Sequence, residues 1–318
     1  MVNRIATHAS DIDGIASAAL FLIKYPKLKI DFLKIGDLKY VQDIEYDYII
    51  DLPKTAGAKV NIDHHLSNYQ NLKKKRVLKD TDVVDPNAPS AATLVIKYLK
   101  LEDNKIAREI VKMAEKADTG NHDKNLIKLD LVIKCFNGNQ EKLYKLAKIM
   151  AEKGKKVLKD PWVKSEWKRI EPHYKKGEKI SKEIAKICKK GKIKNAIVDL
   201  KSGFPRIAFG SIAHQFLKNG GEVIAVVNRM TEEDNLCPPA QKREQEPQAK
   251  FSFRVNKNVV YDVRKIAEKL NGGGHIKASG GRVKLEDYPK ALVFVLTEFL
   301  KRGKTGYFLV KDGEIKKI

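Results

Sequence analysis

Cysteine is scarce in this sequence. Its 318 residues include three cysteines, Cys135, Cys188 and Cys237, which are far apart and form no Cys-x-x-Cys pair. A disulfide framework needs several regularly spaced cysteines, and a zinc site of the cysteine type needs close pairs. The sequence therefore excludes both as the plan of the fold.

Long apolar runs are also missing. Residues 1–7 lack the apolar stretch of a secretory signal peptide. The longest apolar run, around residues 291–300, is interrupted and too short to span a bilayer. We therefore expect no membrane segment and a cytoplasmic protein.

Acidic residues are outnumbered by basic ones. There are 40 Asp and Glu against 63 Lys and Arg, which gives a formal net charge of +23. This excess favours polyanionic partners, because released counterions drive association with phosphate chains. Lys, Glu and Ile richness is also typical of proteins from hot-growing organisms, so thermal adaptation is a second explanation. The length predicts two globular domains, each large enough to bury a core.

Two apolar runs end in residues that can bind metal. Residues 48–50 precede Asp51, and a second run ends at Asp63, His64 and His65. Both runs predict buried strands of an open α/β sheet, and the carboxyl ends of parallel strands converge on one crevice. Carboxylates and imidazoles are donors that Mn²⁺ accepts. For the triplet alone, a polar turn that caps a helix explains the pattern equally well.

A similar cluster follows the first predicted strand, residues 2–7. His8 ends this strand, and Asp11 and Asp13 lie in a turn before a predicted helix over residues 15–25. Two positions apart in an extended turn, the acids point to opposite sides and can reach different metal ions. Capping of the helix explains one aspartate, but it explains neither the second nor His8.

A further acid lies at an unfavourable place. Asp118 directly follows an amphipathic helix predicted over residues 106–117. The C-terminal end of a helix carries partial negative charge and disfavours an aspartate. A bound cation would compensate this cost.

The second half of the chain opens with a basic helical stretch. Residues 162–192 predict a long exposed helix or helix pair, whose Lys-rich face is more typical of a solvated surface than of a binding site. Residues 232–250 are polar and contain three prolines, which predicts an irregular loop.

A glycine run lies near the C-terminal end. Gly272, Gly273 and Gly274 precede His275, and Arg254 lies upstream in a Ser-Phe-Arg segment. Consecutive glycines let backbone N–H groups approach a phosphate closely, and the planar fork of Arg matches phosphate oxygens. A flexible loop is the other explanation for the glycines.

The N-terminal clusters resemble, in the same order, the four motifs of the DHH phosphoesterase superfamily. This superfamily includes RecJ-type nucleases, short-RNA nucleases, cyclic-dinucleotide phosphodiesterases and family II pyrophosphatases. The resemblance implies two divalent metal ions, with Mn²⁺ favoured and Mg²⁺ or Co²⁺ as alternatives. It implies His8 and Asp11 as ligands of one ion, Asp13, His64 and Asp118 as ligands of the other, and Asp51 as the bridge.

The same resemblance assigns catalytic roles to Asp63, His64 and His65. Asp63 would orient the site or help to bind metal. His65 would hydrogen-bond the scissile phosphate. A water activated by the two ions would attack phosphorus in line.

The segments around Arg254 and the glycine run resemble the DHHA1 domain, which family II pyrophosphatases do not carry. The resemblance implies that Arg254, Gly272, Gly273, Gly274 and His275 bind the substrate. It implies an α/β protein with a cleft between two domains. We expect a parallel-sheet DHH domain over residues 1–160, a helical connector over residues 161–193 and a smaller α/β DHHA1 domain over residues 194–318.

The implied activity is metal-dependent hydrolysis of phosphodiesters to nucleoside 5′-monophosphates. The compact length favours short oligoribonucleotides or cyclic dinucleotides. A RecJ-like 5′-3′ exonuclease on single-stranded DNA or RNA is an alternative, as are a bisphosphoadenosine phosphatase and a non-catalytic nucleic-acid-binding or replication-partner protein. The sequence leaves a homodimer open.

Overall fold

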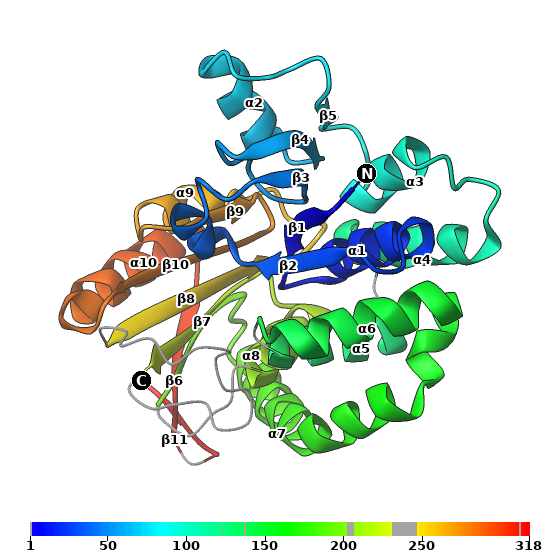
Figure 1. The fold of residues 1–318 in the computed structure, drawn as a ribbon. Coiled ribbons are helices and arrows are strands. Elements are labelled where there is room, and N and C mark those ends of the chain that lie inside the picture. The colour runs from blue at the N-terminus through cyan, green and yellow to red at the C-terminus, as the bar shows by residue number, and fades with distance from the viewer. Residues whose placement is uncertain (1, 122, 137, 202–206, 231–246, 312) are drawn as a thin grey trace. The chain divides into compact units, whose positions relative to one another are not determined.

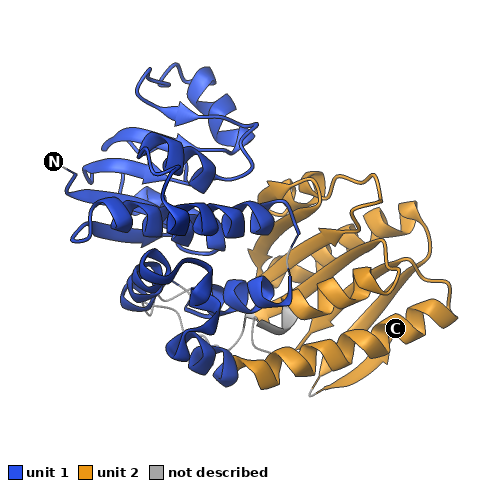
Figure 2. Cartoon of the chain, turned by 90° about the vertical axis from the view of Figure 1, so that its right-hand side faces the viewer, with its two compact units in different colours: residues 1–169 blue, residues 170–318 orange. Residues whose placement is uncertain are grey.

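The computed structural model describes residues 2–121, 123–136, 138–201, 207–230, 247–311 and 313–318. The chain divides into two compact units, residues 1–169 and residues 170–318 (Figure 2). The division falls inside helix α7 (Pro161–Lys190), a single helix that contains Pro172. Among the described residues, no helix combines the length and apolar character that crossing a bilayer requires.

The first unit is built around a parallel sheet with the strand order β2-β1-β3-β4-β5 (Figure 1). Apolar residues such as Ile5, Ile49 and Ile62 are fully buried in its strands. The parallel sheet predicted for this part of the chain is confirmed. The strands are β1 (Arg4–His8), β2 (Lys29–Leu33), β3 (Tyr46–Ile50), β4 (Ala58–Asp63) and β5 (Val83–Val84).

Helices surround this sheet. Helix α1 (Ile12–Lys24) is rich in Ala, Ile and Leu and is buried over most of its length, which lets it pack against α3, α4 and α6. The other helices of the unit are η1 (Ile35–Tyr40), α2 (Leu66–Lys74), α3 (Ala91–Tyr98), α4 (Lys105–Asp118), α5 (Lys124–Phe136), α6 (Gln140–Lys153) and η2 (Gly154–Lys159).

The second unit contains a mixed sheet with the order β12-β11-β6-β7-β8-β10-β9. Strands β11, β6 and β7 are parallel, whereas β8, β10 and β9 continue the sheet with antiparallel pairs, and β12 pairs antiparallel with β11. The strands are β6 (Asn195–Leu200), β7 (Val223–Met230), β8 (Gln248–Val255), β9 (Gly273–His275), β10 (Ala278–Lys284), β11 (Thr305–Lys311) and β12 (Glu314–Lys317).

The two faces of this sheet bury separate cores. Neighbouring side chains on a strand point to opposite faces, so Val198 joins one core and Ile197 the other. Residues of α7 and α8, including Ile184 and Phe216, fill the first core, and residues of α10, including Phe299, fill the second. The helices are α8 (Ile207–Lys218), α9 (Arg264–Glu268), η3 (Leu285–Asp287) and α10 (Tyr288–Arg302).

The glycine run departs from the loop that its composition suggests. It enters the hairpin of β9 and β10, in which Gly273 pairs with Gly280, and Gly280 in turn pairs with Ser252 of β8. Of the predicted loop 232–250, residues 231–246 lie outside the described residues, and Gln248 already belongs to β8. Glycine and polar residues carry little strand propensity, so pairing with distant strands decides both cases.

Candidate metal centre

The end of β1 and the start of α1 bring the first two candidate ligands together. Asp11 caps α1, since its Oδ1 accepts a hydrogen bond from the backbone N of Gly14 at 3.1 Å. Its Oδ2 lies 2.6 Å from Nδ1 of His8. This turn is tight, because a Cβ atom on Gly14 would lie 2.1 Å from the carbonyl oxygen of His8. A glycine is therefore required for His8 and Asp11 to meet.

Asp51 lies directly after β3 in a strained conformation. Its φ of 55° is in the left-handed region, which non-glycine residues seldom adopt. Its backbone N donates to the carbonyl oxygen of Ile62 at 2.9 Å, and the residue is 4% exposed. The turn directs Asp51 Oδ2 to 3.5 Å from Nδ1 of His8. Backbone strain of this kind is concentrated at functional sites.

Asp13 is buried beneath helix α3. Its two carboxylate oxygens accept hydrogen bonds from the backbone N atoms of Ala91 and Ala92, at 2.6 and 2.8 Å. These are the first N–H groups of α3, whose partial positive charge stabilises a carboxylate. Asp13 thus joins α1 to α3, while its Oδ2 also lies 3.6 Å from Nε2 of His64.

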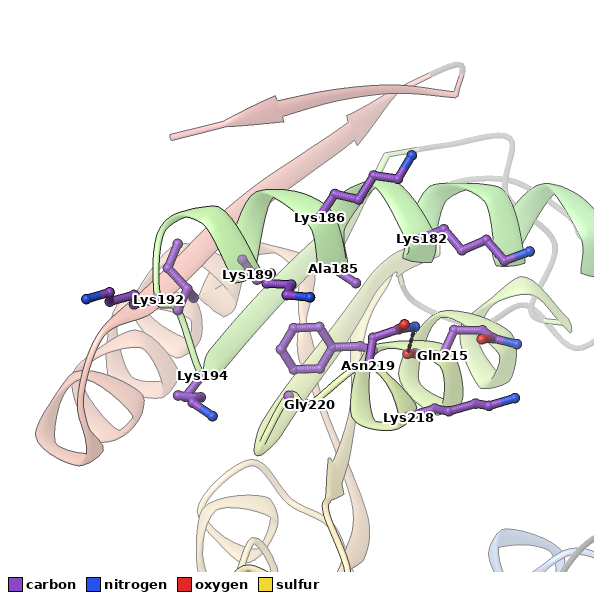
Figure 3. A pocket seen from close by; sticks show the side chains of 14 residues that line it. Lys182, Ala185, Lys186, Lys189, Lys192, Lys194, Gln215, Lys218, Asn219 and Gly220 are labelled. Carbon is purple, nitrogen blue, oxygen red and sulfur yellow. Dashed lines mark hydrogen bonds between the residues drawn. The ribbon is translucent and has the colours of Figure 1, made fainter.

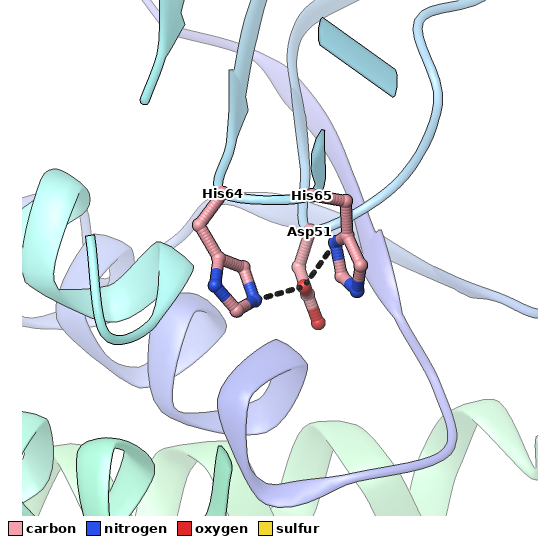
Figure 4. A group of neighbouring side chains, drawn as sticks. All are labelled: Asp51, His64 and His65. Atoms are coloured by element: carbon pink, nitrogen blue, oxygen red, sulfur yellow. Dashed lines mark ion pairs between the residues drawn. The ribbon is translucent and has the colours of Figure 1, made fainter. Parts of the chain in front are cut away.

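His64 is the centre of the remaining contacts. Its Nε2 lies 3.1 Å from Oδ2 of Asp118, the last residue of α4. The same nitrogen lies 3.7 Å from Oδ1 of Asp51 (Figure 4). Its Nδ1 faces the carbonyl oxygen of Ala88 at 3.3 Å. This contact favours the tautomer protonated at Nδ1, which leaves Nε2 as the metal donor. Asp118, the acid at the C-terminal end of α4, therefore lies beside an imidazole that can carry positive charge.

All six candidate ligands predicted from the sequence lie in one region of the first unit. Within the described residues they form overlapping groups whose donor atoms lie within 4.8 Å of one another, and Asp51 and His64 each belong to two of these groups. The groups are His8, Asp11 and Asp51; Asp13, His64 and Asp118; and Asp51, His64 and His65.

The chemistry of this donor set fits divalent metal ions. Three buried donor atoms, His8 Nδ1, Asp51 Oδ1 and His64 Nε2, have no hydrogen-bond partner in the described part of the chain. A buried polar atom without a partner is costly, and two metal ions, one near His8 and one near His64, would satisfy all three atoms. Mixed carboxylate and imidazole ligands suit Mn²⁺ and similar ions.

The crowding of these groups shifts their pKa values. Burial raises the pKa of Asp51 to about 7, and the charge of Asp11 adds to this shift. Burial also raises the pKa of Asp13, together with the charges of Asp51 and Asp118. The pKa of His8 is raised although burial opposes it, because Asp11 and Asp51 favour the imidazolium. The raised pKa values mean that these groups hold protons in the absence of metal. Two bound cations would replace the protons and stabilise the same carboxylates.

Asp63 lies outside these groups, and protein donors surround its two oxygens. Its Oδ1 accepts from Nδ1 of His65 at 2.8 Å and from the backbone N of His64 at 2.8 Å. Its Oδ2 accepts from Nδ2 of Asn68 at 2.6 Å. Of the two roles that the sequence left open for Asp63, these contacts favour orientation of the histidines over metal binding.

Sequence reasoning missed two asparagines that support this arrangement. Asn68 of α2 donates from Nδ2 to Oδ1 of Asn61 at 2.8 Å, in addition to its bond with Asp63. Asn61, fully buried in β4, donates in turn to the carbonyl oxygens of Ile49 and Leu52. The sequence does contain one signal of this arrangement, because Asn61 is a polar residue inside the apolar run that ends at Asp63.

Apart from His65, the predicted substrate-binding residues lie in the second unit. Arg254 pairs in register with Ala278 of β10, and Ala278 pairs with His275 of β9. Residues directly opposite one another project from the same face of a sheet, so Arg254 and His275 share one face. The structure therefore brings these two residues to the same row of strands.

The three glycines have separate explanations. A Cβ atom on Gly272 would lie 1.9 Å from the carbonyl oxygen of Gly280, and Gly274 has a φ of 132°. Close packing within the hairpin therefore requires glycine at both positions. A Cβ atom on Gly273 would meet no heavy atom within 4 Å among the described residues, so packing there leaves its glycine unexplained.

Comparisons with known proteins agree with this architecture. The model of the DHHA1 domain matches residues 191–301. Among solved structures, the chain is similar to a pGpG-specific phosphodiesterase, PggH from Vibrio cholerae, with a TM-score of 0.60 and 19% sequence identity, over 95% of this chain and 100% of that one. A search of curated proteins finds no significant match. The structural likeness shows a shared fold.

Proposed function

We propose that this chain is a metal-dependent phosphodiesterase of the DHH–DHHA1 type that cleaves short oligoribonucleotides or cyclic dinucleotides. The DHHA1 match over residues 191–301 and the fold shared with a phosphodiesterase support this proposal. The observation that carries this proposal is the position of Asp51. One of its oxygens lies near His8 and the other near His64, so that it joins two groups of ligands.

Six residues would hold two divalent ions, and the two imidazoles among them favour Mn²⁺. When bound, the ions would activate a water and stabilise negative charge at phosphorus. The chain fixes the ligands before metal arrives, because Asp13 is anchored on α3 and Asp51 on β4. The ligands are His8, Asp11, Asp13, Asp51, His64 and Asp118.

His65 would contact the scissile phosphate. Asp63 holds Nδ1 of its ring, which directs the other nitrogen, Nε2, away from the carboxylate. The bond to Asp63 also raises the pKa of His65 to about 9, although burial opposes this shift. A hydrogen bond from Nε2 to a phosphate oxygen would stabilise the charge that develops during attack. Arg254 and His275 of the second unit would bind the nucleotide.

The reaction adds water across a phosphodiester bond. The water oxygen forms the new bond to phosphorus, the bond to the 3′ oxygen breaks, and that oxygen leaves with the electron pair and takes up a proton. With a linear dinucleotide, the step separates two nucleotides, one with a new 5′ phosphate and one with a free 3′ hydroxyl. With a cyclic dinucleotide, the first such step opens the ring to a linear dinucleotide, and a second step releases nucleoside 5′-monophosphates. The similarity to a phosphodiesterase whose named substrate, pGpG, is a dinucleotide favours a short substrate.

A single-strand exonuclease is the second candidate. The net charge of +23 favours it, because a long polyanion gains more from such a charge than a dinucleotide does. Product analysis with Mn²⁺ separates the two candidates. We would compare a labelled dinucleotide and cyclic di-AMP with long single-stranded RNA and DNA. Faster cleavage of the two small compounds supports the first proposal, and stepwise loss of 5′-mononucleotides from the long strands supports the second.

The metal assignment has its own test. Asp51→Asn keeps the shape of the side chain and tolerates the left-handed conformation, but it removes the charge that joins the two groups. We expect hydrolysis to fall by more than about a hundredfold. Asp47→Asn is the matched control, since Asp47 lies on the same strand and contacts Lys59 and the backbone of Asn3 instead. Equal activity of the two variants would overturn the assignment.

A further inference from the structure

A basic groove lies in the second unit, between the C-terminal half of α7 and the end of α8 (Figure 3). It encloses about 960 Å³, and fourteen residues line it. Its floor is apolar and closed, because Cys188, Ile193 and Phe216 are at most 4% exposed. Exposed lysines surround this floor. They are Lys182, Lys186, Lys189, Lys192, Lys194 and Lys218.

Helix geometry gathers these lysines on one side. Lys182, Lys186 and Lys189 follow one another at intervals of four and three residues, so they share one face of α7. Helix α7 ends in a turn where the backbone N of Ile193 donates to the carbonyl oxygen of Cys188. The chain then enters β6, next to β7, which follows α8. Lysines from both helix ends therefore meet around the same hollow.

The end of α8 is shaped to leave this hollow open. Helix α8 closes with a hydrogen bond from the backbone N of Gly221 to the carbonyl oxygen of Phe216 at 3.1 Å. A Cβ atom on Gly221 would lie 2.1 Å from the ring of Phe216. Because the backbone packs this closely against the ring, glycine is required here, and the ring of Phe216 stays buried as the floor of the groove.

Among the described residues, the charge of these lysines has no acidic counterpart in the lining of the groove. In the part of the chain that the structure describes, none of the lining residues is acidic, and none of the six lysines forms an ion pair. The carboxylate of Glu178 accepts a hydrogen bond of 2.8 Å from Gln215, a residue of the lining, and contacts none of the six lysines in a described ion pair. Like charges three and four residues apart on a helix destabilise it slightly. A bound partner of opposite charge would remove this repulsion between the lysines of α7.

The helix dipole explains only part of the cluster. Cations near a helix C-terminus are stabilised by the partial negative charge there, and this accounts for Lys189. The effect is confined to the last turn. Lys182 and Lys186 lie further from the end of α7, at Lys190, and need another explanation.

We propose that this groove, which includes none of the candidate metal ligands, binds the phosphate backbone of single-stranded RNA. The choice of nucleic acid among polyanions rests on the proposed function. From Lys182 to Lys189 the helix rises about 10 Å, at about 1.5 Å per residue. If the single strand is stacked as in a duplex, where each strand carries one phosphate per about 3.4 Å of axis, it presents about three phosphates over that length.

An acidic protein fits the groove less well. Protein interfaces depend on exposed aromatic or arginine anchors that enter desolvated pockets. Here the aromatic residue of the lining, Phe216, is 1% exposed, and no described lining residue is an arginine. Point charges on flexible stems, without such an anchor, suit a chain of phosphates.

The salt dependence of binding tests the proposal. Binding of labelled single-stranded RNA of about 24 residues would be measured by fluorescence anisotropy between about 50 and 200 mM salt, in EDTA to prevent cleavage. Each phosphate contact contributes about −0.7 to the slope of log K against log salt for a single strand. The triple variant Lys182→Gln, Lys186→Gln, Lys189→Gln is therefore expected to weaken binding and to reduce the slope by about 2.

Two triple variants serve as controls. Lys182→Arg, Lys186→Arg, Lys189→Arg keeps the charge and should keep the slope. Lys97→Gln, Lys105→Gln, Lys112→Gln removes three exposed lysines from helices of the first unit and should leave the slope nearly unchanged. An equal effect of the two glutamine variants, or no effect of the groove variant, would overturn the proposal.

Two further measurements separate this inference from the proposed function. Hydrolysis of a dinucleotide should be the same in the groove variant and the wild type, because a dinucleotide does not need the groove. Loss of that activity would instead assign the lysines to the hydrolytic site and overturn the inference. The second measurement is competition, in which polyglutamate and unlabelled RNA of equal charge each displace the labelled RNA. Equal displacement by the two competitors would overturn the inference in favour of an acidic protein partner.

Discussion

Asn68 donates a hydrogen bond of 2.6 Å to the Oδ2 atom of Asp63, and Asp63 uses its other oxygen to hold the ring of His65. Asn68 of helix α2 therefore positions His65, the proposed phosphate contact, through the carboxylate of Asp63. The same amide group reaches Asn61 in strand β4, so the orientation of His65 depends on a helix and a strand together.

Replacement of Asn68 should affect both stability and turnover. Asn68→Ala leaves the buried Asp63 Oδ2 without this donor, which should cost about 1 to 3 kcal/mol in the free energy of unfolding. Because His65 loses its fixed support, kcat should fall about 10- to 100-fold. Denaturation in urea and steady-state kinetics measure the two effects. Asn71→Ala, at an exposed position of the same helix, should change neither. A loss of stability with unchanged kcat would show that Asn68 is merely structural.

Replacement of Gly14 separates packing from helix propensity. Gly14→Ala should be destabilising by about 1 to 3 kcal/mol, because the added Cβ would overlap the carbonyl oxygen of His8. Propensity alone predicts the opposite, a gain of about 1 kcal/mol. Gly36→Ala is the control, since a Cβ there meets nothing within 4 Å among the described residues. Thermal melting that shows Gly14→Ala to be more stable than the wild type would contradict the observed approach of α1 to β1.

Metal binding should stabilise the protein. Carboxylates that repel one another in the metal-free site gain partners when ions bind, so Mn²⁺ should raise the melting temperature and EDTA should reverse the change. At a metal concentration of a hundred times the dissociation constant, the expected gain is about 2.7 kcal/mol. Asp51→Asn should lose most of this gain, whereas Asp47→Asn should keep it. An equal response of both variants would mean that metal binds elsewhere.

Asp160 should make stability depend on pH at the start of α7. Burial opposes its ionisation, but Lys153 and the backbone N–H groups of Trp162 and Val163 lower its pKa below the usual value. The carboxylate therefore stabilises the fold above the pKa of an aspartate in the unfolded chain, about 4. This contribution disappears as the pH falls through the lower folded-state pKa.

The variant Asp160→Asn tests this dependence. It should be less stable than the wild type by about 1 kcal/mol at neutral pH, and the difference should shrink at acidic pH. Urea denaturation at several pH values measures it. Asp80→Asn, at an exposed aspartate, should show no such trend. A difference that stays constant down to acidic pH would mean that hydrogen bonding, and not charge, stabilises this helix end.

Much of the candidate site could be predicted from the sequence, because its residues follow local patterns. His8, Asp51 and Asp63 each lie at the end of a strand or directly after it, and parallel strands place such ends at one edge. The extent of α4, predicted over residues 106–117, follows in the same way from apolar periodicity. Local sequence therefore determined which residues could bind metal, although their roles stay predictions.

Other features depend on contacts between distant segments, and only the tertiary structure decided them. The strands β9 and β10 form from glycine-rich sequence because β8 offers them an edge. Asn68 matters because α2 folds back onto β4, and the lysines of α7 form a groove because α8 lies beside them. Periodicity and propensity describe neighbours in the chain, whereas these features arise from neighbours in space.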